Sequence, residues 1–376
     1  MAGIYLHIPF CKKRCIYCDF YSTTDSDKRS LYVEALKKEL ETRKDYLGND
    51  AVETIYFGGG TPSQLKPSEV GSLITHIKSL FATADDMEIT IEANPDDIND
   101  SYLQELSKTD VNRISIGIQS FDDKRLKFLN RRHDSRQAIT AVERCRRHGL
   151  KNISIDLIYG FPGETMDAWS EDIGKAIALD VDHISAYHII YEEGTPLHRL
   201  LKQHAICELD EDASLGQFKQ LKSTLEKAGY IHYEISNFCK PGRHSRHNTA
   251  YWQDKKYLGC GPSAHSYDLT SRRWNVSDLS IYMDKVQNGG TYSTEEKLDL
   301  ATKYNEYVML SLRTMWGLRL DTISSRFGKR FLDFFMKNAQ RHIDDGCLCI
   351  DNGNVRLTTK GIFVSDGVMS DLMFVE

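Results

Sequence analysis

Cys11-Lys-Lys-Arg-Cys15-Ile-Tyr-Cys18 places three thiols on one short stretch, directly behind the apolar run Ile4–Ile8 and Pro9. On a loop, three such thiolates can converge on one metal centre. Structural zinc sites and electron-transfer clusters normally use four protein ligands, so three ligands predict a centre with one open position. An iron–sulfur cluster with one iron free for a small molecule meets that description. The alternatives are unrelated buried thiols, or zinc with a distant fourth ligand such as a histidine.

Outward from this loop, short β-rich runs alternate with amphipathic helical stretches up to about residue 190. Asp27–Tyr46, for example, carries leucine and alanine at helical spacing. Six consecutive βα units predict a parallel sheet, closed or partly closed as a barrel, that binds ligands where its strands end. The expected strands are Ile4–Ile8, Glu53–Phe57, Glu88–Glu92, Arg113–Ile118, Ile153–Ile158 and His183–Ile189.

Glycines and polar side chains fall at the ends of these strands. Gly58-Gly59-Gly60-Thr61 ends the second strand, Glu92 closes the third, Gln119 the fourth, and Asp156 lies in the fifth. Glycine lets a backbone approach a ligand closely, although a tight turn would use the same run. Polar side chains that share the mouth of a barrel are more often ligand contacts than core. Taken singly, each of them could instead be a loop cap.

The run Tyr5-Leu-His-Ile-Pro-Phe-Cys11-x3-Cys15-x2-Cys18-Asp-Phe20 resembles the radical S-adenosylmethionine (SAM) superfamily. Within it, the chain resembles the branch that contains the oxygen-independent coproporphyrinogen III dehydrogenases and the HemW-type haem chaperones. The resemblance covers nearly the whole chain. It implies a partial six-unit barrel, and a 4Fe–4S cluster on Cys11, Cys15 and Cys18 whose fourth iron is chelated by SAM.

The resemblance also implies a set of SAM contacts. Arg131 is expected to pair with the methionine carboxylate, a contact that suits the planar guanidinium. Ile190 and His265 fall on two further contact positions, which the family specifies more loosely. The other expected contacts, in order, are Tyr5, Tyr17, Gly59, Gly60, Thr61, Glu92, Gln119 and Asp156.

Past Tyr191 the alternation of strands and helices ends. We expect three domains: a radical SAM core barrel over 1–230, an irregular haem-motif segment packed on it over 231–290, and a mostly helical C-terminal domain over 291–376. Asp351-Asn-Gly353 is a hairpin turn signal within that last domain, which therefore resembles a winged helix. This C-terminal domain is not basic enough to favour DNA binding. We expect it to pack as a lid over the barrel.

Arg243-His-Ser-Arg-His247-Asn248-Thr-Ala-Tyr251-Trp252 concentrates imidazole, guanidinium and aromatic groups. Haem binding requires an axial ligand, apolar surface for the macrocycle, and cations for the propionates. His247 could ligate the iron, Tyr251 and Trp252 could cover a porphyrin face, and Arg243 or Arg246 could meet propionates. The alternative is a structural histidine in an aromatic turn. The His-Asn-x-x-Tyr-Trp form resembles the signature of the HemW-type chaperones, which favours haem.

Two departures separate the chain from the dehydrogenases it resembles. Those enzymes carry an additional cysteine two residues past the third cluster ligand, where this chain has Phe20. The chain also starts only a few residues before its first expected strand, without the N-terminal extension that the dehydrogenases place beside their substrate. We therefore expect a haem chaperone rather than a catalyst, and leave open whether SAM is cleaved. The alternatives are a porphyrinogen-decarboxylating radical enzyme and a redox-sensing winged-helix regulator.

The composition sets limits on location and partners. A net charge of −6 over 376 residues argues against nucleic acid as the main partner. No apolar run approaches the roughly 20 residues of a membrane span, and the first residues do not resemble a signal peptide. Nine cysteines without regular pairing predict a reducing, cytoplasmic location. We expect haem and haem-acceptor proteins as partners, and leave peripheral membrane contact open.

Anaerobic reconstitution should yield one 4Fe–4S cluster, and replacing Cys11, Cys15 or Cys18 by Ala should abolish it. Iron and sulfide analysis with the visible absorbance spectrum measures the loss. Cys145→Ala and Cys260→Ala are the matched controls and should keep the cluster. If either control loses the cluster as completely, a fourth protein thiolate is a ligand and no iron remains open for SAM.

Overall fold

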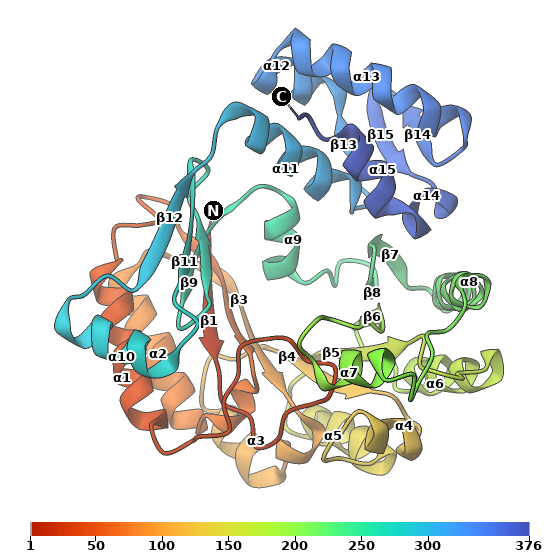
Figure 1. Cartoon of the computed structure of the whole chain (residues 1–376). Coiled ribbons are helices and arrows are strands. Elements are labelled where there is room, and N and C mark those ends of the chain that lie inside the picture. The colour runs from red at the N-terminus through yellow and green to blue at the C-terminus, as the bar shows by residue number, and fades with distance from the viewer. Residues whose placement is uncertain (1, 376) are drawn as a thin grey trace.

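The computed structural model describes residues 2–375, and its main element is a sheet of twelve strands (Figure 1). The strand order is β12-β11-β10-β9-β1-β2-β3-β4-β5-β6-β8-β7. The first six strands of the sequence, β1 to β6, run parallel and neighbour one another in chain order, as six βα units require. Because β12 and β7 form separate edges, the expected partial barrel is confirmed. These six strands are β1 (Ala2–Ile8), β2 (Val52–Gly59), β3 (Thr83–Ala93), β4 (Arg113–Gln119), β5 (Asn152–Tyr159) and β6 (His183–His188).

The helices that follow these strands cover the outer face of the sheet (Figure 1). In β4, Ile114, Ile116 and Ile118 are fully buried against them, while Arg113 and Ser115 alternate onto the inner face. Apolar side chains therefore hold the helices, and polar side chains line the inside of the barrel. The helices are α1 (Arg29–Thr42), α2 (Pro67–Leu80), α3 (Asp100–Leu106), α4 (Asp123–Phe128), α5 (Ser135–Arg147) and α6 (Met166–Ala178), with short 3-10 turns at Pro62–Gln64 and Pro95–Asp97.

The segment expected to be irregular extends the sheet at both edges. β9 pairs parallel to β1, and β10–β12 continue from it antiparallel. On the other side, β8 pairs with β6, and β7 with β8. The added elements are α7 (Pro196–Lys202), α8 (Glu211–Lys227), β7 (Ile231–Glu234), β8 (Asn237–Cys239), α9 (Arg246–Trp252), β9 (Lys256–Cys260), β10 (His265–Tyr267), β11 (Ser271–Asn275), α10 (Leu279–Asn288) and β12 (Ser293–Lys297).

A buried carboxylate fastens this extension to α1. Glu39 is fully buried and accepts hydrogen bonds from Asn275 (2.8 Å), the Gly261 amide (2.8 Å) and the Tyr282 hydroxyl (2.5 Å). Arg43, one turn on, lies 3.3 Å from it. A buried charge is tolerated only when it is paired and hydrogen-bonded, so this network fixes the position of β9–β11 on α1.

The C-terminal domain has its own core, formed by its helices and a three-stranded sheet of order β13-β15-β14. The expected hairpin is present, with Asn352 and Gly353 both at positive φ. The domain's first helix begins only at Leu300, because the residues just before it form β12. The elements are α11 (Leu300–Leu312), β13 (Leu318–Arg319), α12 (Leu320–Phe327), α13 (Lys329–Asp344), β14 (Leu348–Asp351), β15 (Asn354–Leu357), α14 (Thr359–Phe363) and α15 (Ser365–Leu372).

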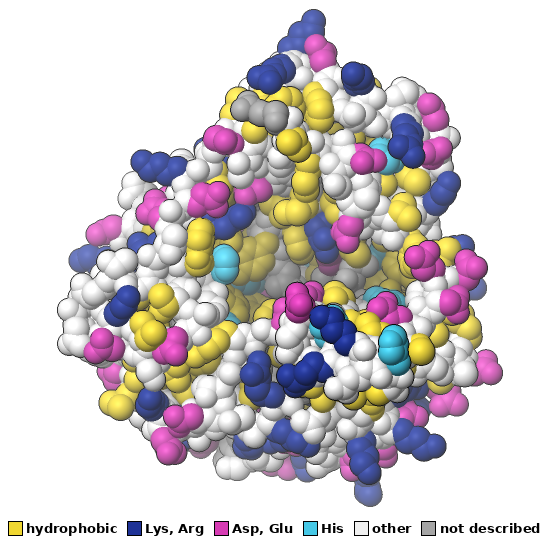
Figure 2. All heavy atoms as spheres, in the orientation of Figure 1, with side chains coloured by type: hydrophobic (Ala, Val, Ile, Leu, Met, Phe, Trp, Pro, Cys, Tyr) yellow, Lys and Arg dark blue, Asp and Glu magenta, His cyan; other side chains and the backbone are white. Residues whose placement is uncertain are grey.

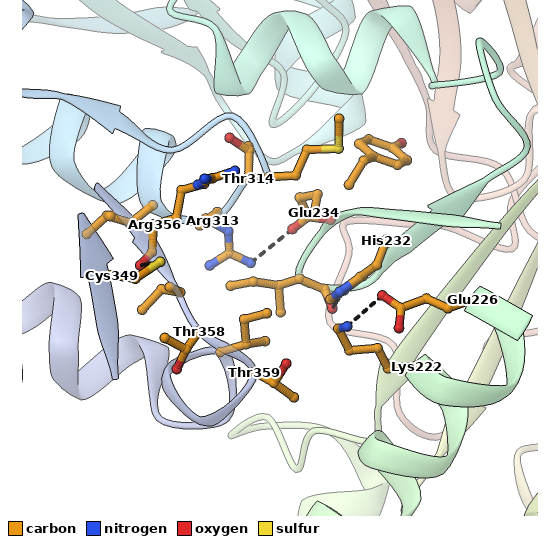
Figure 3. Close-up of a pocket in the computed structure, with 16 residues that line it drawn as sticks. Lys222, Glu226, His232, Glu234, Arg313, Thr314, Cys349, Arg356, Thr358 and Thr359 are labelled. Carbon is orange, nitrogen blue, oxygen red and sulfur yellow. Dashed lines mark hydrogen bonds and ion pairs between the residues drawn. The ribbon is translucent and has the colours of Figure 1, made fainter. Parts of the chain in front are cut away.

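This domain is joined to the edge of the barrel by backbone hydrogen bonds. The Ile235 amide donates to Arg313 (3.2 Å), and the Met315 amide donates to Tyr233 (3.0 Å). The Arg313 guanidinium lies 3.5 Å from buried Glu234, and both residues line a cavity of about 330 Å³ between β7, α8 and the β14–β15 hairpin (Figure 3). The domain lies over one side of the barrel's open face (Figure 1). The domain limits expected from the sequence stay a prediction.

Candidate functional site

A cavity of about 500 Å³ lies at the C-terminal ends of β2–β6, beside the loop that carries the three cysteines. Eight of the nine expected SAM contacts line it, which agrees with ligand binding at the strand ends. Tyr5 lies one layer deeper, with its ring stacked on Tyr56 (centroids 6.2 Å apart). Ile190 lines the cavity, whereas His265 does not. The eight are Tyr17, Gly59, Gly60, Thr61, Glu92, Gln119, Arg131 and Asp156.

The three cysteines face this cavity with different partners. Cys11 Sγ is 3.3 Å from the Thr61 hydroxyl, and Arg131 Nη1 donates to Cys15 Sγ (3.4 Å). Burial raises the pKa of the Cys11 thiol, and raises that of Cys18 to about 11. Across residues 2–375, no three His, Cys, Asp or Glu side chains have the arrangement of a ready metal site. Cluster binding would require these thiols to release their protons.

Packing within the protein accounts for the glycine run at the end of β2. A Cβ on Gly60 would lie 2.8 Å from the Pro9 carbonyl carbon, and Gly59 has φ 109° with the His7 ring 2.7 Å from an ideal Cβ. His7 is held by the Tyr21 carbonyl (2.9 Å). These glycines are thus required to bring β2 against the start of the cysteine loop. The Gly60 amide donates to the Ile8 carbonyl (2.9 Å), which closes this turn against β1.

Two carboxyl groups meet inside the barrel. The Tyr56 hydroxyl donates to Glu92 (2.7 Å), and Ser115 donates to Asp156 (3.4 Å). Burial, helped by the charge of Asp156, raises the pKa of Glu92 to about 7. Burial likewise raises the pKa of Asp156 to about 6. Burial has removed the water that would solvate these two carboxyl groups. Polar groups of a ligand bound in the cavity could form hydrogen bonds to them in place of that water.

Arg131 and Gln119 form the wall of the cavity opposite the glycines. Arg131 Nη2 donates to Asn94 Oδ1 (2.6 Å) and to the Gly117 carbonyl, while its buried Nε has no partner. Gln119 has φ 68°, an unusual conformation for a side-chain-bearing residue, at the register shift that ends β4. Strain of this kind concentrates at ligand sites. The free Nε fits the expected carboxylate partner.

The tract Arg243–Trp252, which the sequence predicts to bind haem, leads into α9 and is packed inside the sheet. His247 is 2% exposed, with Nδ1 2.7 Å from the Thr54 hydroxyl and Nε2 2.8 Å from the Tyr251 hydroxyl. Burial, with the charge of Arg113, lowers the pKa of His247 to about 3. The ring is therefore neutral and both of its nitrogens are in use. Iron ligation by His247 would require these bonds to break, and stays a prediction.

The other members of the tract also have protein partners. Glu88 accepts from the amides of Arg246 (3.2 Å) and His247 (3.1 Å) at the start of α9. Arg246 pairs with Asp86 (3.1 Å), and Arg243 lies 3.5 Å from Asp182. The Arg313 guanidinium lies over the Trp252 ring, 5.1 Å from its centroid. In this arrangement the tract fastens α9 between the barrel and the C-terminal domain.

The comparisons with known proteins agree with this geometry. Residues 5–176 match the radical SAM superfamily, and residues 298–364 match the HemN C-terminal domain. The haem chaperone HemW of Mycobacterium tuberculosis is 32% identical over 99% of this chain and 94% of its own length, and that of Bacillus subtilis is 31% identical over 98% of both. The chain belongs to the HemW family. The structure of coproporphyrinogen III oxidase from Escherichia coli, a radical SAM enzyme, matches with a TM-score of 0.86 at 23% identity, covering 99% of this chain and 90% of that one.

Several site residues of this HemW-family chain were not predicted. Asn94 orients Arg131 from inside Glu92-Ala-Asn94-Pro95, where its place directly after a strand end was the available signal. Tyr56 and Arg113 point inward from β2 and β4, and their alternation with buried Phe57 and Ile114 marks them. Tyr187 lines the cavity and is 43% exposed. Once the barrel is assumed, the alternation of side chains along each strand therefore indicates which residues point into its interior.

In the HemW-family chain, Arg131→Ala and Glu92→Ala should each weaken SAM binding by roughly 10–100-fold, because each removes a hydrogen bond that involves a charged group. Equilibrium binding to the reconstituted protein measures this. Arg132→Ala is the matched control, since Arg132 pairs with Asp96 (2.6 Å) and does not line the cavity. Unchanged affinity in both cavity variants would mean that SAM binds elsewhere.

The raised pKa of Glu92 predicts a pH-dependent stability of the SAM-free protein. The folded chain holds a proton that the unfolded chain releases between about pH 4.5 and 7, so stability falls as pH rises through that window. Glu92→Gln should therefore melt at a higher temperature than wild type at pH 8 and close to wild type at pH 5. Exposed Glu34→Gln is the control. An equal difference at both pH values would contradict the buried, protonated carboxyl.

Proposed function

We propose that this chain binds haem and transfers it to acceptor proteins. The observation that carries the proposal is the likeness, over nearly the full length of both chains, to relatives named haem chaperones. Such coverage includes the barrel, the α9 tract and the C-terminal domain together. A match that spans all of these parts favours the same function for this chain.

We further propose that Cys11, Cys15 and Cys18 hold a 4Fe–4S cluster and that SAM occupies the adjoining cavity. The donor set supports this, because three thiols beside one cavity suit an iron centre with an open position. A cluster and SAM together supply one-electron cleavage chemistry when bound. The chain's own part is to orient SAM, with Arg131 toward its carboxylate and Glu92 and Asp156 deeper in the barrel. The same cavity also serves if SAM only stabilises the fold.

A coproporphyrinogen III dehydrogenase is the second candidate, supported by the shared fold. The side chain at position 20 argues against it. Phe20 stands at the rim of the cavity, 64% exposed, where the resemblance places a cysteine in those enzymes. A phenyl ring can neither transfer a proton nor donate hydrogen as a thiol can. It does offer apolar surface to a planar ligand.

Location and partners follow from the same proposal. All nine cysteines are free, which fits a reducing cytoplasm, and we place the protein there. No helix within residues 2–375 has the length and apolar character that crossing a bilayer requires. We propose haem-acceptor proteins as partners and no nucleic acid.

Titration of the purified, reconstituted chain with haemin should give a saturable Soret band. Incubation with coproporphyrinogen III, SAM and a reductant should give no protoporphyrinogen at enzymatic rates. A known haem-free acceptor apoprotein, added to the loaded chain, should then acquire the Soret band. Absence of any saturable haem spectrum, or steady formation of protoporphyrinogen, would overturn the proposal.

A further inference from the structure

Two of the three cysteines in the loop are hydrogen-bonded to side chains near the strand ends. The Thr61 hydroxyl lies 3.3 Å from Cys11 Sγ, and Arg131 Nη1 lies 3.4 Å from Cys15 Sγ. Asn94 joins these two groups, with Nδ2 3.4 Å from Thr61 Oγ1 and Oδ1 2.6 Å from Arg131 Nη2. We call Thr61, Asn94 and Arg131 the polar bridge. It connects one cysteine to the other, and all five residues line the same cavity.

The direction of each hydrogen bond in the polar bridge follows from the groups involved. A guanidinium has only donors, so the amide oxygen of Asn94 must face Arg131 and its NH2 group must face Thr61. The Thr61 oxygen accepts from Asn94, which leaves the single hydroxyl proton for Cys11. A metal-bound cysteine is a thiolate and can only accept a hydrogen bond. Asn94 thus directs the Thr61 hydroxyl toward the sulfur of Cys11.

The backbone around Asn94 holds the polar bridge in place. Asn94 directly follows β3, its amide donates to Ser63 Oγ (3.4 Å), and its carbonyl accepts from the Asp97 amide (3.0 Å). On the other side, Arg131 Nη2 donates to the carbonyl of Gly117 in β4. An ideal Cβ on Gly117 would lie 3.3 Å from Arg131 Nη2, so the absence of a side chain leaves room for the guanidinium. The bridge is therefore built into the ends of β3 and β4.

The three sulfurs also have partners outside the polar bridge. Cys18 accepts a hydrogen bond from the backbone amide two residues further on, which a side-chain substitution does not remove. Ser22 is hydrogen-bonded to Cys11, and Tyr17 to Cys15. Each of these partners acts on one sulfur. A single substitution at Asn94, by contrast, disturbs the partners of two sulfurs at once.

The Thr61 hydroxyl is shielded from water. Figure 2 shows this face of the molecule hollowed between the barrel and the C-terminal domain, so solvent reaches the interior from this side. Thr61 is nevertheless only 5% exposed. Its hydrogen bond to Cys11 is therefore made by a fixed donor in a region of low dielectric constant, where such a bond is stronger than in water.

Hydrogen bonds to the sulfurs of an iron–sulfur cluster raise its reduction potential, because a donor stabilises the negative charge that an added electron brings. We propose that Asn94 is a positioning residue that raises this potential by holding Thr61 and Arg131 as donors to the sulfurs of Cys11 and Cys15. The proposal rests on the 4Fe–4S cluster proposed above, and assigns the side chains that tune it. Arg131 keeps its unpartnered Nε for the carboxylate of SAM. One guanidinium then serves both the cluster and SAM.

The test is a redox titration of the full reconstituted chain with dithionite, followed by the EPR signal of the reduced cluster. SAM is left out, because Thr61 is also an expected SAM contact. Thr61→Val and Asn94→Leu should each lower the midpoint potential by roughly 30–60 mV, which is a three- to tenfold fall in the ratio of reduced to oxidised cluster. Thr61→Ser keeps the hydroxyl and should stay at the wild-type potential. Thr90→Val is the matched control, since the Thr90 hydroxyl is buried in β3 without a hydrogen-bond partner in the described residues.

The double variant Thr61→Val, Asn94→Leu should have the potential of Asn94→Leu alone, because Asn94 acts on Cys11 through Thr61. Iron analysis verifies the cluster content of each variant, and either single variant suffices for the test. An unchanged potential in both single variants, additive shifts in the double variant, or an equal shift in Thr90→Val would overturn the proposal. If the wild-type chain binds no cluster, the proposed cluster site itself fails. A full cluster at unchanged potential in the variants refutes only the role of Asn94.

Discussion

Strand β1 is hydrogen-bonded on both sides, to β2 and to β9, and this constraint organises the molecule. A strand paired at both edges can present its side chains only to the two faces of the sheet, with a period of two residues. Ile4, Leu6 and Ile8 therefore face the helices and are fully buried, while Tyr5 and His7 point inward. The cysteine loop begins where this alternation ends, so its position relative to the cavity is set by the register of β1.

The polar side chains on the inner face of the barrel are buried and need hydrogen-bonding partners. They find these partners in one another, in successive layers along the barrel. Near the cavity, Glu92 and Asp156 face the ligand site. Below them, Tyr56 links Glu92 to the ring stack that includes His247 (centroids 5.0 Å apart). Arg113, 1% exposed, acts electrostatically on this whole set. The α9 tract and the cavity at the strand ends are therefore neighbouring layers of one polar interior, connected through Tyr56.

The barrel and the cavity could be predicted because their signals are local. Cysteine spacing, the glycine run and apolar alternation each lie within a few residues of the feature they mark. The extension of the sheet could not be predicted in the same way. β10 and β11 are short and polar, and they become strands only by pairing with each other and with β9. The burial of His247 depends on Thr54, almost two hundred residues away, so its sequence context alone suggested an available ligand.

The pairing of Ala2 with Lys256 has a consequence for synthesis on the ribosome. One edge of β1 stays uncovered until more than two thirds of the chain has been translated. During that time, unpaired backbone groups and the apolar side chains beside them are open to other chains. The nascent barrel thus passes through a long period as an incomplete sheet, and its N-terminal strand is among the last to be fully enclosed.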